Sequence, residues 1–205
     1  MNLQGQRSNS DFSDQSHAAP DGSSDRAHEG QPQQRSNTRF GFKAGDFVVY
    51  PAHGVGQISA IEEQTVAGAS LEFFVVYFAK SKMTLRAPTR KAANAGMRKP
   101  SDAAAIQRVR QALSQAPYKA RGNWSKLVQE YAAKINSGDI IALAEVMRDL
   151  YRPALNSGQS YSERQLYVLA LERLSGEVAL VSGITEEESA RELEGLVTTG
   201  ARRNA

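Results

Sequence analysis

The sequence of 205 residues contains no cysteine. Disulfide scaffolds, thiolate nucleophiles and cysteine-based zinc sites are therefore excluded, and nothing marks an oxidising compartment. No run of apolar residues approaches the roughly 18 that a membrane span requires, and the N-terminus has no apolar signal core. These absences predict a cytoplasmic protein that does not enter a membrane.

Histidine is nearly as scarce, and its distribution argues against catalysis. Two of the three histidines, His17 and His28, lie in a polar N-terminal stretch, which leaves His53 in the motif Pro-Ala-His-Gly. Because no carboxylate or second ligand is nearby in the sequence, a turn residue is favoured over a general base or a metal ligand. No glycine-rich phosphate loop, nucleophile elbow or metal motif is present. We therefore predict no catalytic residue, metal, cofactor or small-molecule substrate, and an enzyme is the least favoured class.

Residues 1–39 contain no valine or isoleucine and are rich in Ser, Gln, Asn, Asp and Gly. Such a segment cannot bury enough apolar surface to offset the entropy that is lost on ordering. The sequence predicts a disordered tail over residues 1–39 and a folded part from about Phe40.

Short β-branched and aromatic segments follow between residues 40 and 98, bounded by glycine, proline and Ala-Gly-Ala. The densest is the run from Leu71 to Phe78. Pro51 and Pro88 end segments of this kind, because proline cannot donate to a strand ladder. The pattern predicts a small, strongly bent antiparallel sheet as one domain of residues 40–98.

After about Pro100 the hydrophobic period changes to that of helices. Capping residues predict five helices, which begin at Ser101, at Asn123, at Asp139, at the pair Ser162 and Gln165, and at the pair Thr185 and Glu188. Short connections predict a compact helical domain over residues 99–198, with a flexible C-terminus at 199–205. The predicted fold class is α+β.

Positive charge is concentrated in the middle of the chain. Residues 99–140 carry seven Lys or Arg against three acidic residues, whereas residues 141–205 carry seven against ten. Concentrated cations favour phosphate binding, because the displacement of condensed counterions requires local charge density. On charge alone, a solvated helical face remains the simpler interpretation.

Trp124, the only tryptophan, lies in this basic region and has two interpretations. It shares a helical stripe with Tyr131 and Ile135, which favours a partly buried core residue. It also stands in the first turn of its predicted helix between Arg121 and Lys126. An indole in that position is placed to insert between DNA base steps while the cations neutralise phosphates. Periodicity leaves both interpretations open.

Arg86 is the corresponding candidate in the predicted sheet, where it ends the apolar segment Met-Thr-Leu-Arg-Ala-Pro. It is either a solvated edge cation that discourages aggregation or an anchor beside a sheet edge that pairs with a partner strand. The sequence does not choose between the two.

Taken together, these motifs resemble those of the CarD-type bacterial transcription regulators, also called CdnL proteins. The matching stretches occur in the family's order between residue 40 and about residue 197. They are Phe42-Lys43-Ala44-Gly45-Asp46-Phe47-Val48-Val49-Tyr50-Pro51-Ala52-His53-Gly54, Thr84-Leu85-Arg86-Ala87-Pro88, Asn123-Trp124-Ser125, Ser137-Gly138-Asp139 and Ala144-Glu145-Val146-Met147-Arg148-Asp149-Leu150.

The resemblance implies a Tudor-like antiparallel β-barrel that binds the β subunit of bacterial RNA polymerase, followed by a helical domain that reaches promoter DNA. It implies that Trp124 wedges into the minor groove at the upstream edge of the melted region and that Arg86 contacts polymerase. Glu72 falls in the strand that faces the β subunit. Gln64 stands at another partner-binding position, which is basic in some relatives.

The DNA-binding side departs from the family pattern as well. Lys126 matches, whereas Leu127 and Gln129 stand where certain relatives have cations. The resemblance therefore implies a phosphate contact that depends on Lys126 together with Arg121 or Lys134.

The sequence thus predicts a transcription regulator that stabilises the promoter open complex, acts as a monomer and associates with the nucleoid through RNA polymerase. The alternative is a repressor or architectural protein that binds double-stranded DNA without polymerase. Affinity for bare DNA separates the two hypotheses.

Overall fold

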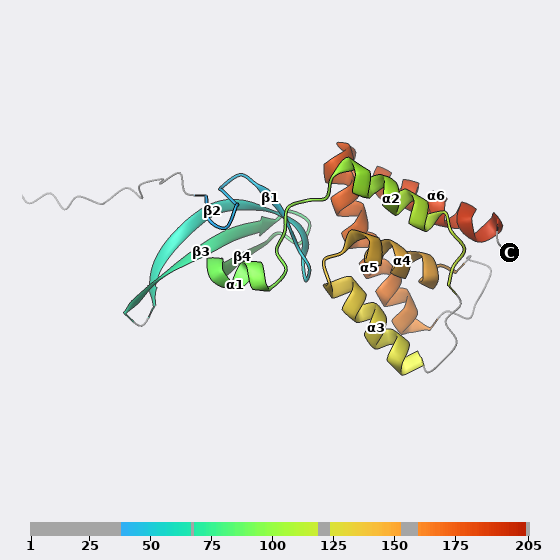
Figure 1. Ribbon diagram of the computed structural model, residues 1–205, viewed down its shortest axis with the longest axis horizontal. Helices are drawn as coiled ribbons and strands as arrows, with labels where there is room; N and C mark the ends of the chain where they lie inside the picture. Colours follow the sequence, from blue (N-terminus) through green and yellow to red (C-terminus); the bar gives the residue numbers. More distant parts are fainter. Residues whose placement is uncertain (1–37, 67, 119–123, 153–159, 204–205) are drawn as a thin grey trace, which may run out of the picture. The chain divides into compact units, whose positions relative to one another are not determined.

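The computed structural model describes residues 38–66, 68–118, 124–152 and 160–203 (Figure 1). Nearly all of the predicted tail, and Asn123 as a predicted helix cap, lie outside the described residues. Residues 36–205 form one compact unit. Its elements are β1 (Phe47–Tyr50), β2 (Gly54–Val66), β3 (Ala69–Phe78), β4 (Met83–Pro88), α1 (Thr89–Asn94), α2 (Ala103–Leu113), α3 (Trp124–Asn136), α4 (Ile140–Leu150), α5 (Tyr161–Ser182) and α6 (Glu186–Arg203).

The four strands form one antiparallel sheet in the order β1-β2-β3-β4. Within the described residues the sheet is not closed, because the outer side of β1 pairs with Arg98 and not with β4. The backbone N–H of Val49 donates to Arg98 at 2.8 Å, and the N–H of Arg98 donates to Val49 at 3.1 Å. The predicted α+β class and antiparallel sheet are confirmed, whereas the predicted barrel is not.

One face of this sheet is covered by a hydrophobic core of its own. Phe74 and Phe78 of β3 are buried there, and Phe42 packs edge-on against Phe74 with ring centroids 5.9 Å apart. The short helix α1 lies against β3 and β4 and brings Ala92 and the following Met97 into the same cluster (Figure 1). α1 was not predicted, because six residues are too few for a helical period to be recognised in the sequence. We call residues 42–98 the sheet part.

Residues 101–203, which we call the helical part, have a separate hydrophobic core. It is centred on α4, which packs against α2, α3 and α5. The predicted three- and four-residue spacing along α4 is confirmed, since Leu143, Val146, Met147 and Leu150 are all buried. No described helix combines the length and hydropathy needed to cross a membrane.

Side-chain caps start two helices where the sequence predicted them. The carboxylate of Asp139 accepts the backbone N–H of Ile141 at 2.8 Å at the start of α4. Before α6, the hydroxyl of Thr185 accepts the backbone N–H of Glu188 at 3.1 Å, and the carboxylate of Glu188 accepts the N–H of Thr185 at 3.0 Å. Reciprocal bonds of this kind satisfy two backbone donors that the helix leaves free.

Two other caps differ from the prediction. α2 is capped by Asp102 instead of Ser101, and its carboxylate accepts a first-turn backbone N–H at 2.7 Å. α5 is capped by Ser160 in a capping box with Glu163, and not by Ser162. In both cases an acidic side chain near the positive end of the helix prevails over a neutral alternative. At the C-terminus, α6 continues beyond residue 198, the predicted end of the helical domain, to Arg203.

Candidate nucleic-acid and partner interfaces

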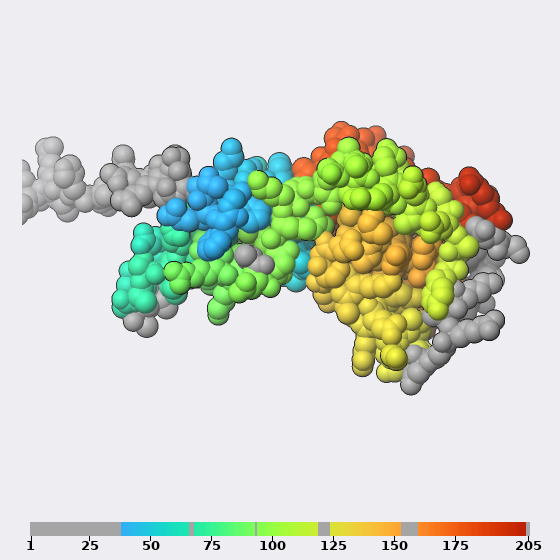
Figure 2. Space-filling view, viewed as in Figure 1, coloured from blue at the N-terminus to red at the C-terminus, as the bar shows by residue number. Residues whose placement is uncertain are grey.

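Trp124 is the first residue of α3, which lies at the surface of the helical part (yellow in Figure 2). Its side chain is partly exposed and packs against the edge of the helical core. The buried residues of α3 are Tyr131 and Ile135, both in its second half. The first half of the helix is therefore less covered than the second. Trp124 therefore packs against the core without being fully covered.

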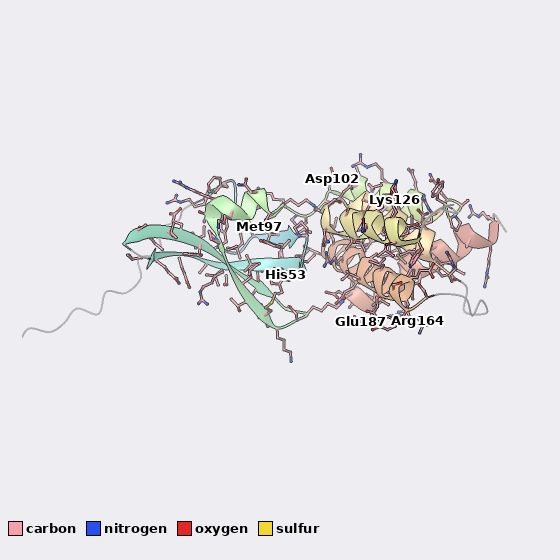
Figure 3. All side chains as sticks on the ribbon, turned by 90° about the horizontal axis from the view of Figure 1, so that it is seen from below. His53, Met97, Asp102, Lys126, Arg164 and Glu187 are labelled. Carbon is pink, nitrogen blue, oxygen red and sulfur yellow. The ribbon has the colours of Figure 1, made fainter. Side chains whose placement is uncertain are left out.

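Lys126 is exposed and lies two residues along α3 from Trp124 (Figure 3). Residues two apart are separated by about 200° around a helix axis, so the side chains of Lys126 and Trp124 leave α3 in nearly opposite directions. Lys134 is farther away, about 15 Å along the axis at 1.5 Å per residue. Its ammonium is also 2.6 Å from the carboxylate of Glu145. Arg121 lies outside the described residues, so of the predicted phosphate contacts the structure describes Lys126 and Lys134, of which Lys126 is nearer to Trp124 along α3.

Ion pairs with the acidic C-terminal helices occupy much of the basic region. Besides Lys134, Arg98 pairs with Glu177 and Arg110 pairs with Glu192, each at 2.6 Å. All three glutamates follow residue 140, so part of the positive charge of the basic region is paired with the acidic C-terminal segment. Within the described part of residues 98–134, the cations that form no ion pair with another described residue are Lys99, Arg108 and Lys126.

A buried polar cluster connects α4 with α3 and with the segment after α2. The carboxylate of Asp149 is buried and accepts hydrogen bonds from the side chain of Arg148 at 2.8 Å and from the backbone N–H of Tyr118 at 2.9 Å. Burial, together with the nearby charge of Asp149, raises the pKa of Tyr131 to about 12. The sequence analysis missed this cluster; its signal is an acidic residue beside Leu150 within the apolar stripe of α4.

Arg86 and Gln64, two of the predicted partner contacts, lie on the same face of the sheet. Strand register and alternation place both on the face opposite the Phe74 core. Both donate to the carboxylate of Glu62, Arg86 at 3.3 Å and Gln64 at 3.4 Å. Glu62 has no signal of its own in the sequence, because its approach to Arg86 follows from the register of β2, β3 and β4. We call this face the open face.

Glu72, the third predicted partner contact, lies on the other face of the sheet. Both of its carboxylate oxygens are 2.8 Å from the guanidinium Nε of Arg39. The three predicted contacts therefore do not share one surface. The last register pair between β3 and β4 joins Phe73 and Pro88, so residues 69–72 form an edge of β3 beyond β4.

Exposed apolar side chains lie on the open face beside Arg86. Phe47 of β1 and Tyr77 of β3 are each 43% exposed and flank Gln57 of β2 in the register. Leu71, near the tip of β3, is 40% exposed. A mixed apolar and charged surface of this kind is suited to a protein partner.

His53 lies in the turn between β1 and β2, as predicted (Figure 3). Its backbone N–H donates to Tyr50 at 2.9 Å, and its ring centroid is 5.3 Å from that of Phe78. Its contacts are those of a turn residue. Across the described ranges, no three His, Cys, Asp or Glu side chains are grouped so that they could hold a metal ion.

Two protein-family models match this chain, one over each part. Residues 42–101 match the CarD-like/TRCF RID domain, and residues 108–194 match the CarD C-terminal domain. The chain is also 31% identical over 147 residues to the "Putative transcription factor YdeB" of Bacillus subtilis (strain 168). That alignment covers 72% of this chain and 96% of the relative.

A small antiparallel sheet followed by a helical part, with a match over each, defines a class of transcription factors. Within that class, the chain belongs to the CarD family. The resemblance on which the sequence analysis relied is confirmed.

Proposed function

We propose that this protein regulates transcription by binding the β subunit of RNA polymerase with its sheet part and promoter DNA with its helical part. The match of residues 42–101 to the CarD-like/TRCF RID domain supports the polymerase contact. The observation that carries the DNA contact is the position of Trp124, which packs on the core and stays partly exposed at the start of α3. We propose residues 40–98 and 99–198 as the corresponding domains of a monomer.

Stabilisation of the open promoter complex follows from differential affinity. A protein that binds the open complex more tightly than the closed one shifts the equilibrium by that difference and no more. An indole inserted at the edge of the melted region has such a preference, because the unstacked base step would have to re-form against the ring. Unstacking costs about a few kcal/mol per step. A preference of ~1.4 kcal/mol holds about ten times more complex open.

Weak affinity for DNA is sufficient in this mechanism. Of the six described cations of residues 98–134, Arg98, Arg110 and Lys134 are already ion-paired with glutamates, which reduces the positive charge that is free to bind phosphates. Binding of the sheet part to polymerase raises the local concentration of the helical part at the promoter. The protein then resides at the nucleoid through polymerase and not through affinity for DNA as such.

The polymerase contact is assigned to the open face and to the edge of β3. Arg86 is more than half exposed beside Glu62, and Gln64 and the exposed Leu71 lie on the same face. The backbone of residues 69–72 is placed to pair with a strand of the partner, where main-chain bonds supply affinity and side chains supply specificity. Glu72 contributes from this edge and not from the open face.

Replacing Trp124 with Ala tests the DNA contact. We expect the lifetime of the open promoter complex, measured by competitor challenge, to fall about tenfold, which corresponds to ~1.4 kcal/mol of differential binding. Affinity for the β subunit should not change. Tyr161→Ala, which removes a 78% exposed aromatic residue of α5, is the matched control and should leave the lifetime unchanged. Equal lifetimes for wild type and Trp124→Ala would show that the indole is only a core residue.

Replacing Arg86 with Glu tests the polymerase contact. The new carboxylate lies beside Glu62 and reverses the charge of the open face, so we expect affinity for the isolated β subunit to fall about tenfold or more. Arg90→Glu reverses an exposed charge on α1 and should leave affinity within about twofold. Unchanged affinity for Arg86→Glu in a binding titration would remove this residue from the interface.

A further inference from the structure

Arg98 is bonded to the sheet part by its backbone and to the helical part by its side chain. Its backbone forms two hydrogen bonds with Val49 at the edge of β1. Its guanidinium Nε donates to the carbonyl oxygen of Gly138, just before α4, at 2.6 Å. The two terminal nitrogens donate to Glu177 of α5 at 2.6 and 2.8 Å. One residue therefore joins the sheet edge to two helices.

Glu177 is a carboxylate that is only 1% exposed. Besides the two bonds from Arg98, it accepts the backbone N–H of Ser101 at 2.9 Å. A buried charge is tolerated only where it is paired and hydrogen-bonded. All three donors belong to residues 98–101, the segment that leads from the sheet part into α2. The contacts of Glu177 therefore fix that segment against α5.

Arg173, one turn before Glu177 on α5, makes a second connection to the sheet part. Its guanidinium donates to the carbonyl oxygen of Pro51 and, at 2.9 Å, to that of Ala52 in the turn between β1 and β2. Burial lowers the pKa of Arg173. On the side of the sheet, the N–H donors of Arg173 are accepted by backbone carbonyl oxygens and not by a carboxylate.

The backbone of α5 also comes close to β2 at Gly176. A Cβ at this position would lie 3.9 Å from Cγ2 of Val55. At the rim, the ammonium of Lys80 is 3.1 Å from Glu172 and 3.2 Å from Glu186, but these groups are nearly half exposed and the pairs are correspondingly weak. The contacts of the buried Glu177 and the half-buried Arg173 are the stronger restraint.

We infer that Arg98 and Glu177 are positioning residues that hold the helical part in one orientation to the sheet part. On the proposed function, on which this step rests, that orientation determines where Trp124 lies when the sheet part is bound to polymerase. A tethered group gains effective concentration only when the tether delivers it to its site. Loss of the Arg98–Glu177 ion pair allows Trp124 to occupy many positions relative to the sheet part. A smaller fraction of the polymerase-bound protein then has Trp124 at its site on the promoter.

The absence of cysteine makes the orientation directly measurable. Spin labels at Thr84→Cys in β4 and Gln129→Cys in α3, both exposed positions, report the distance between the two parts in the full chain by pulsed electron paramagnetic resonance. We expect one narrow distance distribution for this labelled protein. In Glu177→Gln the negative charge is lost and one of the two acceptor oxygens becomes an NH2 group, which faces an N–H donor of Arg98 or Ser101. We expect the distribution to become at least twice as wide.

Glu192→Gln is the matched control, because it removes an ion pair of equal length, Arg110 to Glu192, that lies wholly within the helical part. It should leave the distance distribution narrow. In complexes with polymerase and promoter, Glu177→Gln should shorten the open-complex lifetime at least threefold, with affinity for the isolated β subunit within twofold of wild type. Glu192→Gln should leave both quantities unchanged.

Two results would overturn the inference: a distribution for Glu177→Gln as narrow as that of wild type, or a widened distribution with an unchanged lifetime. If the wild-type protein does not prolong the lifetime of the open promoter complex, the proposed function fails. The width of the spin-label distance distribution in Glu177→Gln then decides by itself whether Arg98 and Glu177 hold the two parts in one orientation. If Glu177→Gln does not fold, Arg98→Lys takes its place. That variant keeps a positive charge for Glu177 but loses the paired donors and the bond to Gly138, and it must widen the distribution for the inference to stand.

Discussion

Trp124 packs against the helical core and is partly exposed. Contact with the core restricts the rotamers of the indole, and a side chain that is already ordered loses less entropy when it binds. Periodicity along α3 left a core residue and a DNA wedge as alternatives. The choice between them depends on how far the neighbouring elements cover the indole ring. The spacing of apolar residues along one helix does not specify the exposed fraction of a side chain.

Ser189 of α6 is the clearest target for stabilisation at the scale of one residue. It is fully buried, and its hydroxyl has no hydrogen-bond partner among the described residues. Ser189→Ala removes this uncompensated polar group and improves helix propensity. We expect the free energy of unfolding in urea to rise by about 1 kcal/mol.

Ser175→Ala provides the comparison for Ser189, because the hydroxyl of Ser175 is also buried but donates to the carbonyl oxygen of Glu172 at 3.1 Å. Removal of the Ser175 hydroxyl should raise the free energy of unfolding by less than removal of the Ser189 hydroxyl does, or should lower it. A loss of stability in Ser189→Ala alone would mean that this hydroxyl is hydrogen-bonded.

At the scale of elements, the helix starts show how far local rules extend. Asp139 and Thr185 cap their helices as predicted, since each side chain meets backbone donors two or three residues ahead. Ser160 and Ser162 both satisfy the capping pattern, with an acidic or an amide residue three positions later. A pattern that two neighbouring serines share cannot identify the cap. The structure selects Ser160, which pairs with the charged partner.

The sheet depends on the absence of a side chain at Gly56 in β2. A Cβ there would lie 2.7 Å from Cγ1 of Val76 and 2.8 Å from the ring of Phe78, both of which are core residues. Overpacking of this kind costs about 1–3 kcal/mol. We therefore expect Gly56→Ala to lower the free energy of unfolding by that amount, measured by urea denaturation.

Gly195→Ala in α6 is the control for Gly56, because a Cβ at that position meets nothing within 4 Å. Its stability should rise by up to about 1 kcal/mol from helix propensity alone. If Gly56→Ala has the same free energy of unfolding as the wild-type protein, the core of the sheet part rearranges to accommodate the added methyl group.

At the scale of the whole molecule, charge pairing decides between a regulator that needs polymerase and an independent DNA binder. A protein that contacts six to ten phosphates shows a slope of about −5 to −9 in log affinity against log salt. Half of the six described cations of residues 98–134, namely Arg98, Arg110 and Lys134, are ion-paired with glutamates, so we expect affinity for a bare promoter fragment to be weak, with a slope shallower than about −5 in a fluorescence titration.

Lys126→Gln should reduce that slope by about one unit. Lys134→Gln should change it less, because Glu145 already neutralises Lys134. Tight binding to the fragment with a steep slope would favour the polymerase-independent repressor or architectural protein.

The sequence by itself determined the order of a small antiparallel sheet and a helical part, most of the apolar stripes, and the motifs of the family. These features depend on alternation, helical period and capping, which act over a few neighbouring residues. It did not determine that Glu72 lies on the face opposite Arg86, that the sheet stays open at Arg98, or that Glu177 is buried against residues 98–101. Those outcomes depend on strand register and on contacts between residues up to 79 positions apart, which only the tertiary structure brings together.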